Sequence, residues 1–450
     1  MSDFCQDIKK KEKELEEKVG FALDRAKKSG ATDCEISIAS TKGLDVSSRN
    51  CELENIEFEY DRGMVVTVYK GMRKAHASTT DLSPDAIEQT IGAALDLTRY
   101  TNEDPCNGVL EPKYLCTEIR DFDVLHEVLT DTDEAVRKCI ELEKYALDTK
   151  TKGITKTDGA AFSSTLFCQS YGSSNGFMAT SSSSYNSLAL GLIGENGGKM
   201  QTDSGFSAHC NLQKLYDTQT IAREAIDNTV AKLDVKTIET GAYNVIFSKR
   251  AAISLFSRLF QGISGGAIYR KSSFLTDTLG KQIFPDFLTV REDPFLQERP
   301  ESSSYDNEGC RRAQSNIVEN GVLNTYLLSS YTARKLKMEP NGHNGGVGST
   351  FVTAKEQYDF DELLRQVNRG LVITKVMGPG VDIVSGNYSQ GASGYFFDNG
   401  RRVHAVDEIT IASNLRELFM NIKALANDYD QRYKLKCPSF LIENITVSAK

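Results

Sequence analysis

The stretch SNIVENGVLNTYLL, residues 315–328, contains two short apolar runs separated by Asn320-Gly321. Asn and Gly tolerate the two positive φ angles of a type I′ turn, which joins antiparallel strands with the correct twist. A second stretch, FFDNGRRV at residues 396–403, repeats this pattern around Asn399-Gly400. We therefore expect residues 236–450 to form a C-terminal domain dominated by a large antiparallel sheet of barrel or sandwich type.

The start of this domain is predicted to be a strand followed by a helix. The strand covers residues 243–247, and Ser248 is suited to cap the helix that follows. The apolar face of that helix carries Ala252, Phe256, Leu259 and Ile263 at helical spacing. Gly265-Gly266 are expected to end the helix in a left-handed turn.

Residues 1–100 predict an N-terminal α+β domain. A charged helix over about residues 6–29 precedes four short alternating runs at 34–39, 43–48, 53–60 and 64–69. Ser83-Pro84 then has the composition of a helix start.

Residues 101–235 predict a middle helix-plus-strand region packed with the N-terminal domain. Residues 101–130 are rich in acids and contain Pro105 and Pro112, which is typical of a linker. Helices are expected at about 132–148 and 220–233, with strands in the Ser- and Gly-rich segment between them. The fold class is therefore predicted to be α+β.

Composition excludes several classes of protein. The 450 residues carry a formal net charge of −9, and binding to nucleic acid requires a dense basic surface that this balance does not favour. No apolar run approaches the roughly 20 residues of a membrane span, and the N-terminus lacks a signal-peptide layout. We expect a cytoplasmic protein that binds neither nucleic acid nor membrane. Its ten scattered cysteines are expected to be reduced.

Two serines lie within a Gly-x-Ser-x-Gly pattern. Ser264 lies in Gly262-Ile-Ser-Gly-Gly266, and Ser174 in Gly172-Ser-Ser-Asn-Gly176. A hydrolase elbow needs a strand before its serine and a helix after it. Because a helix is predicted before Ser264, the motif is weak there, and the pattern at Ser174 is expected by chance in a chain rich in Gly and Ser.

The five histidines, His76, His126, His209, His343 and His404, are far apart in the sequence. None is three to five residues from another, so no two share a helix face in the manner of many zinc ligands. His126-Glu127 begins like a zincin motif, but no second histidine follows at the required spacing. Surface or hydrogen-bonding roles are favoured, and a site assembled from distant residues stays open.

Two glycine-rich stretches, GHNGGVG at residues 342–348 and Gly378-Pro-Gly380, raise the question of a phosphate cradle. Neither has the Gly-Lys-Ser/Thr of a P-loop or the strand and helix context of a dinucleotide fold. Two alternatives stay open: plain turns, and loops in which glycine allows close approach of a peptide main chain.

Several long segments, in order along the chain, resemble the TldD/PmbA family, and specifically its PmbA (TldE) branch, whose members are also called modulators of DNA gyrase. The segments that carry the resemblance are residues 78–84, 263–274, 279–283, 331–336, 385–394 and 406–412.

The resemblance implies a subunit of a zinc metalloprotease made of two related chains, which trims or degrades unstructured peptides such as antibiotic precursors and antitoxins. In the TldD-type subunit a His-Glu-x-x-x-His motif binds the zinc and supplies a general base. The corresponding positions here begin with Ser257 and Arg258 and end with Gly262. None of these residues can replace the ligands or the base.

The resemblance also implies that Cys437 is near the position of a metal-binding cysteine and is a structural remnant here. We therefore expect no cofactor and no catalytic residue in this chain, with zinc in a TldD-type partner. The expected partners are that subunit, in a heterodimer or larger assembly, and an unstructured peptide; a homodimer is an alternative when the chain is alone. The residues expected to contact the peptide by strand addition are Ser385, Gly386, Asn387, Tyr388, Ser389, Gly391, Ala392, Ser393 and Gly394.

Two other functions stay open at this point. One is a regulatory protein that binds DNA gyrase or another client without proteolysis. The other is an independent serine hydrolase that uses Ser264 or Ser174.

Overall fold

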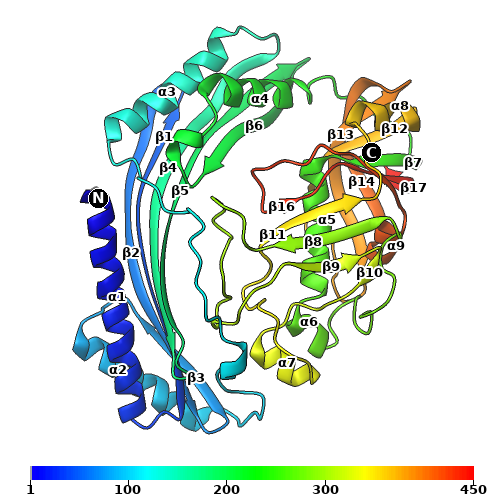
Figure 1. The fold of residues 1–450 in the computed structure, drawn as a ribbon. Helices are drawn as coiled ribbons and strands as arrows, with labels where there is room; N and C mark the ends of the chain where they lie inside the picture. The colour runs from blue at the N-terminus through cyan, green and yellow to red at the C-terminus, as the bar shows by residue number, and fades with distance from the viewer. Residues whose placement is uncertain (1–2, 450) are drawn as a thin grey trace.

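The N-terminal lobe is built on one long, curved sheet. The computed structural model describes residues 3–449, and this sheet contains six antiparallel strands in the order β3-β2-β1-β4-β5-β6 (Figure 1). The strands are β1 (Asp33–Arg49), β2 (Glu52–Lys70), β3 (Arg73–Thr79), β4 (Ile154–Ser173), β5 (Met178–Asn196) and β6 (Lys199–His209). Together with the C-terminal sheets described below, this lobe confirms the α+β fold class.

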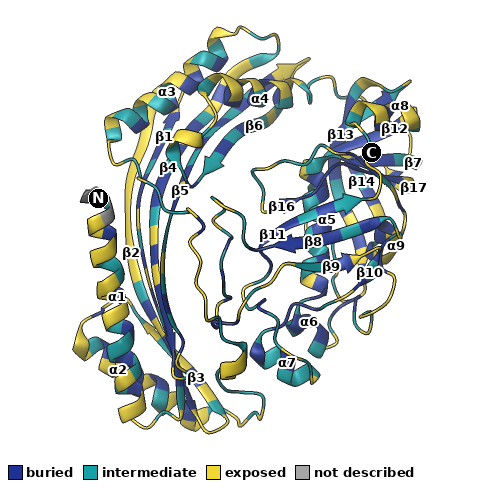
Figure 2. Ribbon diagram, viewed as in Figure 1, coloured by how far each residue is buried: buried dark blue, intermediate teal, exposed yellow. Residues whose placement is uncertain are grey.

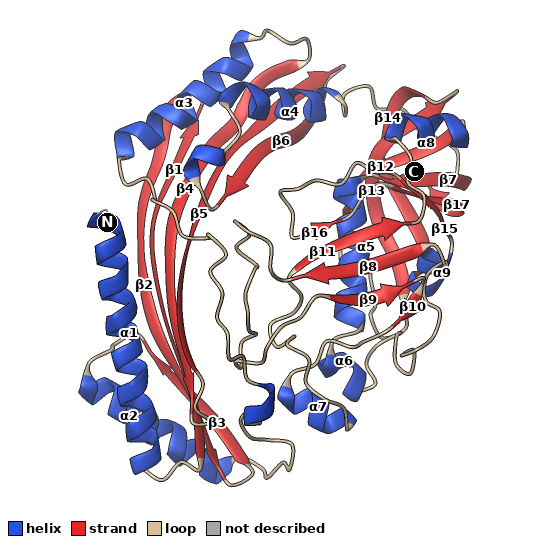
Figure 3. Ribbon diagram, viewed as in Figure 1, coloured by secondary structure: helices blue, strands red, loops and turns tan. Residues whose placement is uncertain are grey.

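Four helices cover one face of this sheet (Figure 3). They are α1 (Asp3–Lys28), α2 (Pro84–Leu97), α3 (Thr132–Asp148) and α4 (Thr218–Val230). Ser83 caps α2 and Pro84 occupies its first turn, as the sequence predicts.

The alternation of β1 explains why the helices lie on one face. Its even-numbered residues are apolar at both ends: Ile36 and Ile38 pack under α1 and α2, and Leu44 and Val46 pack under α3 and α4. Side chains alternate along a strand, so the odd-numbered residues lie on the opposite face, which we call the concave face. One strand therefore contributes to two hydrophobic cores.

The four short β runs expected in residues 34–69 are wrong as separate strands. They form two continuous strands, β1 and β2, that pair from Asp33↔Tyr69 to Arg49↔Glu52. Gly43 and Gly63 suggest turns in the sequence, but here both belong to the pairing ladder. Ladder hydrogen bonds from the long neighbouring strand override the weak local preference of these residues.

Residues 101–131, which we call the strap, run between the N-terminal sheet and the C-terminal lobe. The strap contains one short 3-10 turn, Pro112–Tyr114. On one side the Val124 carbonyl accepts a hydrogen bond from Ser184 N of β5 at 3.0 Å; on the other, Cys116 N donates to Gly309 O at 2.9 Å. The expected linker is thus irregular, and it contacts both lobes.

The C-terminal lobe contains a five-stranded barrel. Strands β14, β13, β12, β7 and β17 follow one another, and pairing of β14 with β17 closes the circle. All neighbours are antiparallel except β12 and β7. The strands of this sheet, with β15 added beside β17, are β7 (Gly241–Phe247), β12 (Arg369–Met377), β13 (Asn387–Asp398), β14 (Arg401–Asn414), β15 (Ile422–Leu425) and β17 (Phe440–Ser448).

A second sheet in this lobe has the order β10-β9-β8-β11-β16. Its strands are β8 (Leu288–Asp293), β9 (Ser315–Glu319), β10 (Val322–Leu323), β11 (Ser349–Ala354) and β16 (Leu435–Lys436). Both predicted hairpins are confirmed: Asn320 and Gly321 have φ of 48° and 78°, and Asn399 and Gly400 have φ of 52° and 66°. The second strand of the first hairpin is shorter than expected, because β10 ends at Leu323.

Helix α5 (Lys249–Gly262) belongs to the core shared by the barrel and the second sheet. Ser248 caps it as predicted, and Phe256 is fully buried. The Phe256 ring stacks on Phe284, with centroids 5.5 Å apart, and meets Phe440 of β17 edge-on at 5.6 Å. The other helices of this lobe are α6 (Gly265–Tyr269), α7 (Ser330–Leu336), α8 (Phe360–Val367) and α9 (Leu415–Met420).

The distribution of burial follows these layers (Figure 2). Buried side chains concentrate between the N-terminal sheet and its helices and around α5. Among residues 3–449, the structure contains no helix with the length and apolar character needed to cross a bilayer.

Candidate functional site

The positions where the family resemblance implies a zinc motif lie on the C-terminal half of α5. Ser257 donates its hydroxyl hydrogen bond to Ser254 O at 2.7 Å, inside the same helix. Arg258 donates to the side-chain oxygen of Gln261 at 3.1 Å. A hydroxyl engaged with its own helix and a guanidinium cation do not form a zinc site.

Gly262 is tightly packed and carries no side chain that could bind a metal. A Cβ atom at this position would lie 3.0 Å from Phe274 Cε1 and 3.1 Å from Leu275 Cδ1. Ser273 also closes over the helix end, because its hydroxyl donates to Gly262 O at 2.6 Å. A side chain at residue 262 would require Phe274 and Leu275 to shift, and the residues present at 257, 258 and 262 do not fit zinc.

Cys437 lies in the same hydrophobic core and is 1% exposed. Burial raises the pKa of its thiol well above the usual value, with a smaller contribution from Asp428. Without a metal ion, this environment therefore favours the neutral thiol.

A cavity of about 580 Å³ lies at the end of α5. It is lined by the last turn of α5, the start of α6, the start of α7, the glycine-rich loop 342–348 and Lys434. Four of these segments are far apart in sequence, which explains why no single motif predicted the cavity. Burial, together with the charge of Arg312, lowers the pKa of Lys434.

The expected left-handed helix stop at Gly265-Gly266 is wrong. Helix α5 ends at Gly262, and Ser264 caps a new short helix, α6, by accepting a hydrogen bond from Ala267 N. The reason for glycine at residue 265 is close packing: a Cβ there would lie 2.5 Å from Thr332 Oγ1 of α7. These two residues therefore begin a helix on the cavity wall.

The serine pattern does not assemble a nucleophile in the described part of the chain. Ser264 donates its hydroxyl to Gln261 O at 2.9 Å, and Ser174 donates to Asp33 Oδ1 at 2.9 Å. Neither hydroxyl has the contact with a histidine base that serine catalysis requires. The geometry therefore gives no support to a serine hydrolase.

His343 is a buried residue of the glycine-rich loop 342–348, and its contacts hold that loop in place. It is 8% exposed, and its Nε2 lies 2.6 Å from Glu292 Oε2 while its Nδ1 lies 2.9 Å from Asn341 Oδ1. Glu292 also accepts a hydrogen bond from Gly348 N at the other end of the loop. A buried imidazole and carboxylate thus fix both ends of the loop that lines the cavity.

The glycines in these loops allow close approach of main chain within the protein itself. Gly342 has φ of +77°, and a Cβ there would lie 2.5 Å from Arg311 O. A Cβ at Gly380 would lie 1.7 Å from Ser389 O. The sequence left two alternatives open, plain turns and close approach of a main chain. Close approach describes both Gly342 and Gly380, and the main chain that approaches them belongs to this protein.

Residues 385–394, predicted to contact a peptide, lie in β13 and the turn before it. Strand β13 pairs with β14 on one side and β12 on the other. Pairing of β13 with β12 begins at Gly391. In the part of β13 before Gly391, Ser389 N donates a hydrogen bond to Gly380 O at 2.6 Å. Strand addition therefore finds no free edge along most of β13, and peptide contact by these residues stays a prediction.

The structure brings His126 together with Asp123 of the strap and Glu298. Their ligand atoms lie within 4.8 Å of one another. However, Lys214 Nζ already lies 2.6 Å from Glu298 Oε1, and His126 Nε2 lies 2.9 Å from Asp123 O. Existing partners satisfy this group, which links the strap to the C-terminal lobe.

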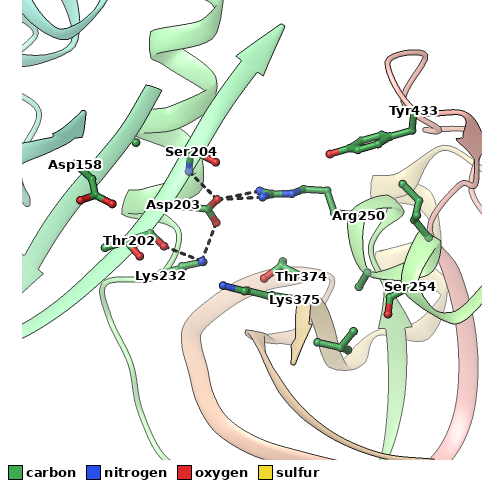
Figure 4. Close-up of a pocket in the computed structure, with 14 residues that line it drawn as sticks. Asp158, Thr202, Asp203, Ser204, Lys232, Arg250, Ser254, Thr374, Lys375 and Tyr433 are labelled. Atoms are coloured by element: carbon green, nitrogen blue, oxygen red, sulfur yellow. Dashed lines mark hydrogen bonds and ion pairs between the residues drawn. The ribbon is translucent and has the colours of Figure 1, made fainter. Parts of the chain in front are cut away.

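A second cavity, of about 420 Å³, lies between β6 and the turn after α4 in the N-terminal lobe and α5 and β12 in the C-terminal lobe (Figure 4). Asp203 of β6 lies at its centre, paired with Lys232 at 2.8 Å and with Arg250 of α5 at 3.1 Å. Lys375 of β12 also lines this cavity. No local sequence pattern predicts this cavity, because its residues come from both lobes.

Comparison with known proteins gives a consistent result for the whole chain. Models of the PmbA/TldA metallopeptidase family match residues 34–98 as domain 1, 128–233 as the central domain and 240–449 as the C-terminal domain. The chain is 37% identical to Metalloprotease PmbA of Escherichia coli O157:H7 over 444 residues, covering 98% of both proteins. It is 36% identical to the Metalloprotease PmbA homolog of Haemophilus influenzae, covering 98% of this chain and 97% of the relative.

Solved structures share the fold at lower sequence identity. A Bacteroides thetaiotaomicron protein described as a modulator of DNA gyrase has a TM-score of 0.89 and 22% identity, covering 96% of this chain and 98% of its own. TldE from Thermococcus kodakarensis has a TM-score of 0.82 and 18% identity, covering 96% of this chain and all of its own.

Proposed function

This chain belongs to the PmbA/TldD metallopeptidase family, and from that premise we propose that it is a PmbA/TldE-type, non-catalytic subunit. In this proposal a TldD-type partner supplies the zinc, the two chains work in the cytoplasm, and their substrates are unstructured peptides such as antibiotic precursors and antitoxins.

The observation that carries the proposal is the packing of α5. Residues 257, 258 and 262 offer no zinc ligand, and the core packs tightly around Gly262. Cys437, in the same hydrophobic core, is one potential ligand and is 1% exposed. A catalytic zinc usually keeps three protein ligands and one open position, a set that these residues do not supply.

The remaining surfaces favour a role in holding an extended peptide. The concave face of the N-terminal sheet carries hydroxyl, amide and aromatic side chains on β4 and β5, including Gln169, Tyr171, Ser181 and Ser183, which line a cavity shared with the strap. The 580 Å³ cavity at the end of α5 adds a wall made largely of loop backbone. In this proposal, these hydroxyl, amide and backbone groups supply hydrogen-bonding partners for an extended peptide.

Metal analysis and peptidase assays test the proposal. The purified chain alone is expected to contain no stoichiometric zinc and to leave a disordered test peptide intact. The pair purified with a TldD-type subunit is expected to contain zinc and to cleave the peptide in a chelator-sensitive manner. Chelator-sensitive cleavage by this chain alone would contradict the assignment.

The regulatory alternative makes a different prediction for the same samples. A gyrase-binding regulator would bind its client without the TldD-type subunit and without cleaving it. We expect no gyrase in a pull-down with this chain alone, because in our proposal the chain acts on peptides together with a TldD-type subunit.

A further inference from the structure

The first half of β2 is an open sheet edge. Residues 64–70 of β2 pair with β3, but residues 52–62 have β1 as their sole strand neighbour within residues 3–449. The outer main-chain groups of these residues therefore lack a ladder partner. Unprotected edges of this length template pairing with another strand, and native proteins normally cover or blunt them.

The side chains along this edge form two distinct ridges. Leu53, Ile56, Phe58 and Tyr60 lie on the helix-covered face, because Ile56 and Phe58 pair with the buried residues Val46 and Leu44. These four side chains nevertheless remain 48%, 37%, 68% and 63% exposed. In Figure 2 much of β2 is correspondingly drawn as exposed. We call this set the apolar ridge.

The opposite, concave side of the edge is acidic. Glu57, Glu59 and Asp61 pair with Asp45, Gly43 and Thr41 of β1, so these acids share the concave face with Asp45. None of the four carboxylates has an ion-pair partner among the described residues. We call Asp45, Glu57, Glu59 and Asp61 the acidic ridge.

Space for an incoming strand exists where β3 ends. A hollow of about 670 Å³ lies there, lined by Thr41, Asp61 and Val65 on the sheet and by Ser78 and Thr79 at the end of β3. A strand paired with residues 52–62 would occupy the same row as β3. The hollow lies where the ends of the two strands would meet.

We propose that residues 52–62 of β2 are the docking edge for a strand of the partner subunit, which carries basic side chains toward the acidic ridge and apolar side chains toward the apolar ridge. The identity of the partner rests on the proposed function. Charge complementarity determines the basic character of the strand. A second copy of this chain fits poorly, because antiparallel pairing of two such edges would place acidic ridges side by side.

A folded partner also fits better than a free peptide. Four large apolar side chains exposed together on a sheet edge favour aggregation unless they are covered. A stable subunit provides that cover continuously. A transient peptide substrate would leave the edge open between turnovers.

Hydrogen exchange of this chain, alone and with the purified TldD-type subunit, tests the proposal. On complex formation, amides within residues 53–61 are expected to exchange at least roughly tenfold more slowly, because outward N–H groups gain partners. The double variant Phe58→Glu/Tyr60→Glu is expected to weaken the Kd roughly 100-fold. Glu57→Lys/Glu59→Lys is expected to weaken it as well, and binding by the unchanged chain is expected to fall as salt rises.

Tyr100→Glu is the matched control, because Tyr100 is an aromatic residue of the same lobe and is 85% exposed. Its Kd is expected to stay within about twofold of the unchanged chain. All the substituted side chains are exposed, so circular dichroism and Tm are expected to show that each variant stays folded.

The other outcomes are distinguishable. A complex that forms without any change in exchange at residues 53–61 would overturn the docking edge but leave the proposed function intact. Absence of a complex would overturn both. Protection of these amides in a homodimer, or on addition of a disordered peptide alone, would assign the edge to a different occupant and overturn the proposal.

Discussion

Glu143 of α3 is a fully buried carboxylate that connects three parts of the N-terminal sheet. It accepts hydrogen bonds from the Ser48 hydroxyl near the end of β1, from Cys51 N in the turn and from the Thr157 hydroxyl in β4. Asn50 and Cys51 form that turn with φ of 55° and 61°; Asn tolerates this conformation, but it is unfavourable for Cys51. The carboxylate therefore stabilises a costly turn at the end of the docking edge.

Replacement of Glu143 by Ala is expected to lower the free energy of unfolding by about 2–4 kcal/mol, because it leaves buried donors without an acceptor. Urea denaturation followed by circular dichroism measures this change. The control is Glu141→Ala on the exposed face of the same helix, which is expected to change stability by no more than about 0.5 kcal/mol. Equal effects of the two substitutions would show that the buried contacts do not matter.

At the scale of elements, the contact between α6 and α7 depends on one missing methyl group. A Cβ at Gly265 would lie 2.5 Å from Thr332 Oγ1 and 3.0 Å from Leu327 O. At the next residue, Gly266, the nearest atoms belong to the flexible end of Arg270, at 3.2 Å. The two adjacent glycines therefore have different reasons to be small.

Gly265→Ala is expected to destabilise the protein by about 1–3 kcal/mol, because α6 must move away from α7. Gly266→Ala is expected to be neutral or to stabilise by up to about 1 kcal/mol, because Ala favours the helix and Arg270 can move. Thermal unfolding of both variants measures the difference. A larger loss at residue 266 than at 265 would contradict the packing argument.

The sequence predicted elements well where local chemistry determines them. Caps at Ser83 and Ser248 and the two Asn-Gly turns require nothing beyond their neighbours, and the structure confirms all four. The lengths of β1 and β2 could not be predicted, because Gly43 and Gly63 are held in the ladder by the strands beside them: Gly63 by β1, and Gly43 by β2 and β4. Local preference is weak compared with such pairing.

The candidate site was also predictable only where it depends on a local stretch of sequence. The residues at positions 257, 258 and 262 could be named from the resemblance, but the tight packing around Gly262 by Phe274 and Leu275 is seen only in three dimensions. The cavity at the end of α5 joins segments more than 150 residues apart, from Phe260 to Lys434. No local sequence pattern predicts that these segments lie together.

At the scale of the molecule, the junction between the lobes contains acids in an environment that opposes their ionisation. Burial raises the pKa of Glu308 to about 7, with further contributions from Asp306 and Glu35. Its carboxyl group accepts hydrogen bonds from Ser330 N and Oγ, both at 2.6 Å. Glu35 of β1 lies on the concave face, where Tyr69 and Tyr171 donate to it at 2.8 Å and 2.9 Å.

A raised folded-state pKa means that the folded protein binds the Glu308 proton more tightly than the unfolded chain. The resulting stabilisation is fully present below the ordinary glutamate pKa and is lost as pH rises from about 4.5 to about 7. The loss amounts to at most roughly 3 kcal/mol. Urea titrations at pH 5 and pH 8 should therefore show lower stability at the higher pH from this group.

Glu308→Gln is expected to reduce that pH dependence, because an amide preserves the polar contacts with Ser330 without ionising. The matched control is Glu339→Gln, where a carboxyl in the same lobe accepts a hydrogen bond from the exposed Tyr114 hydroxyl. An unchanged difference between pH 5 and pH 8 in the Glu308 variant would assign the effect to other acids.

The strap has a consequence for how the protein forms during translation. Arg334 donates to the carbonyls of Cys106, Gly108 and Val109 at 3.1, 3.0 and 2.6 Å, and up to 228 residues separate these partners. At roughly 5–20 residues per second, the ribosome takes about 10–45 s to synthesise that interval. During this time residues 106–109 of the strap lack their guanidinium partner, so the nascent chain exposes these carbonyl groups to solvent until the second lobe is synthesised.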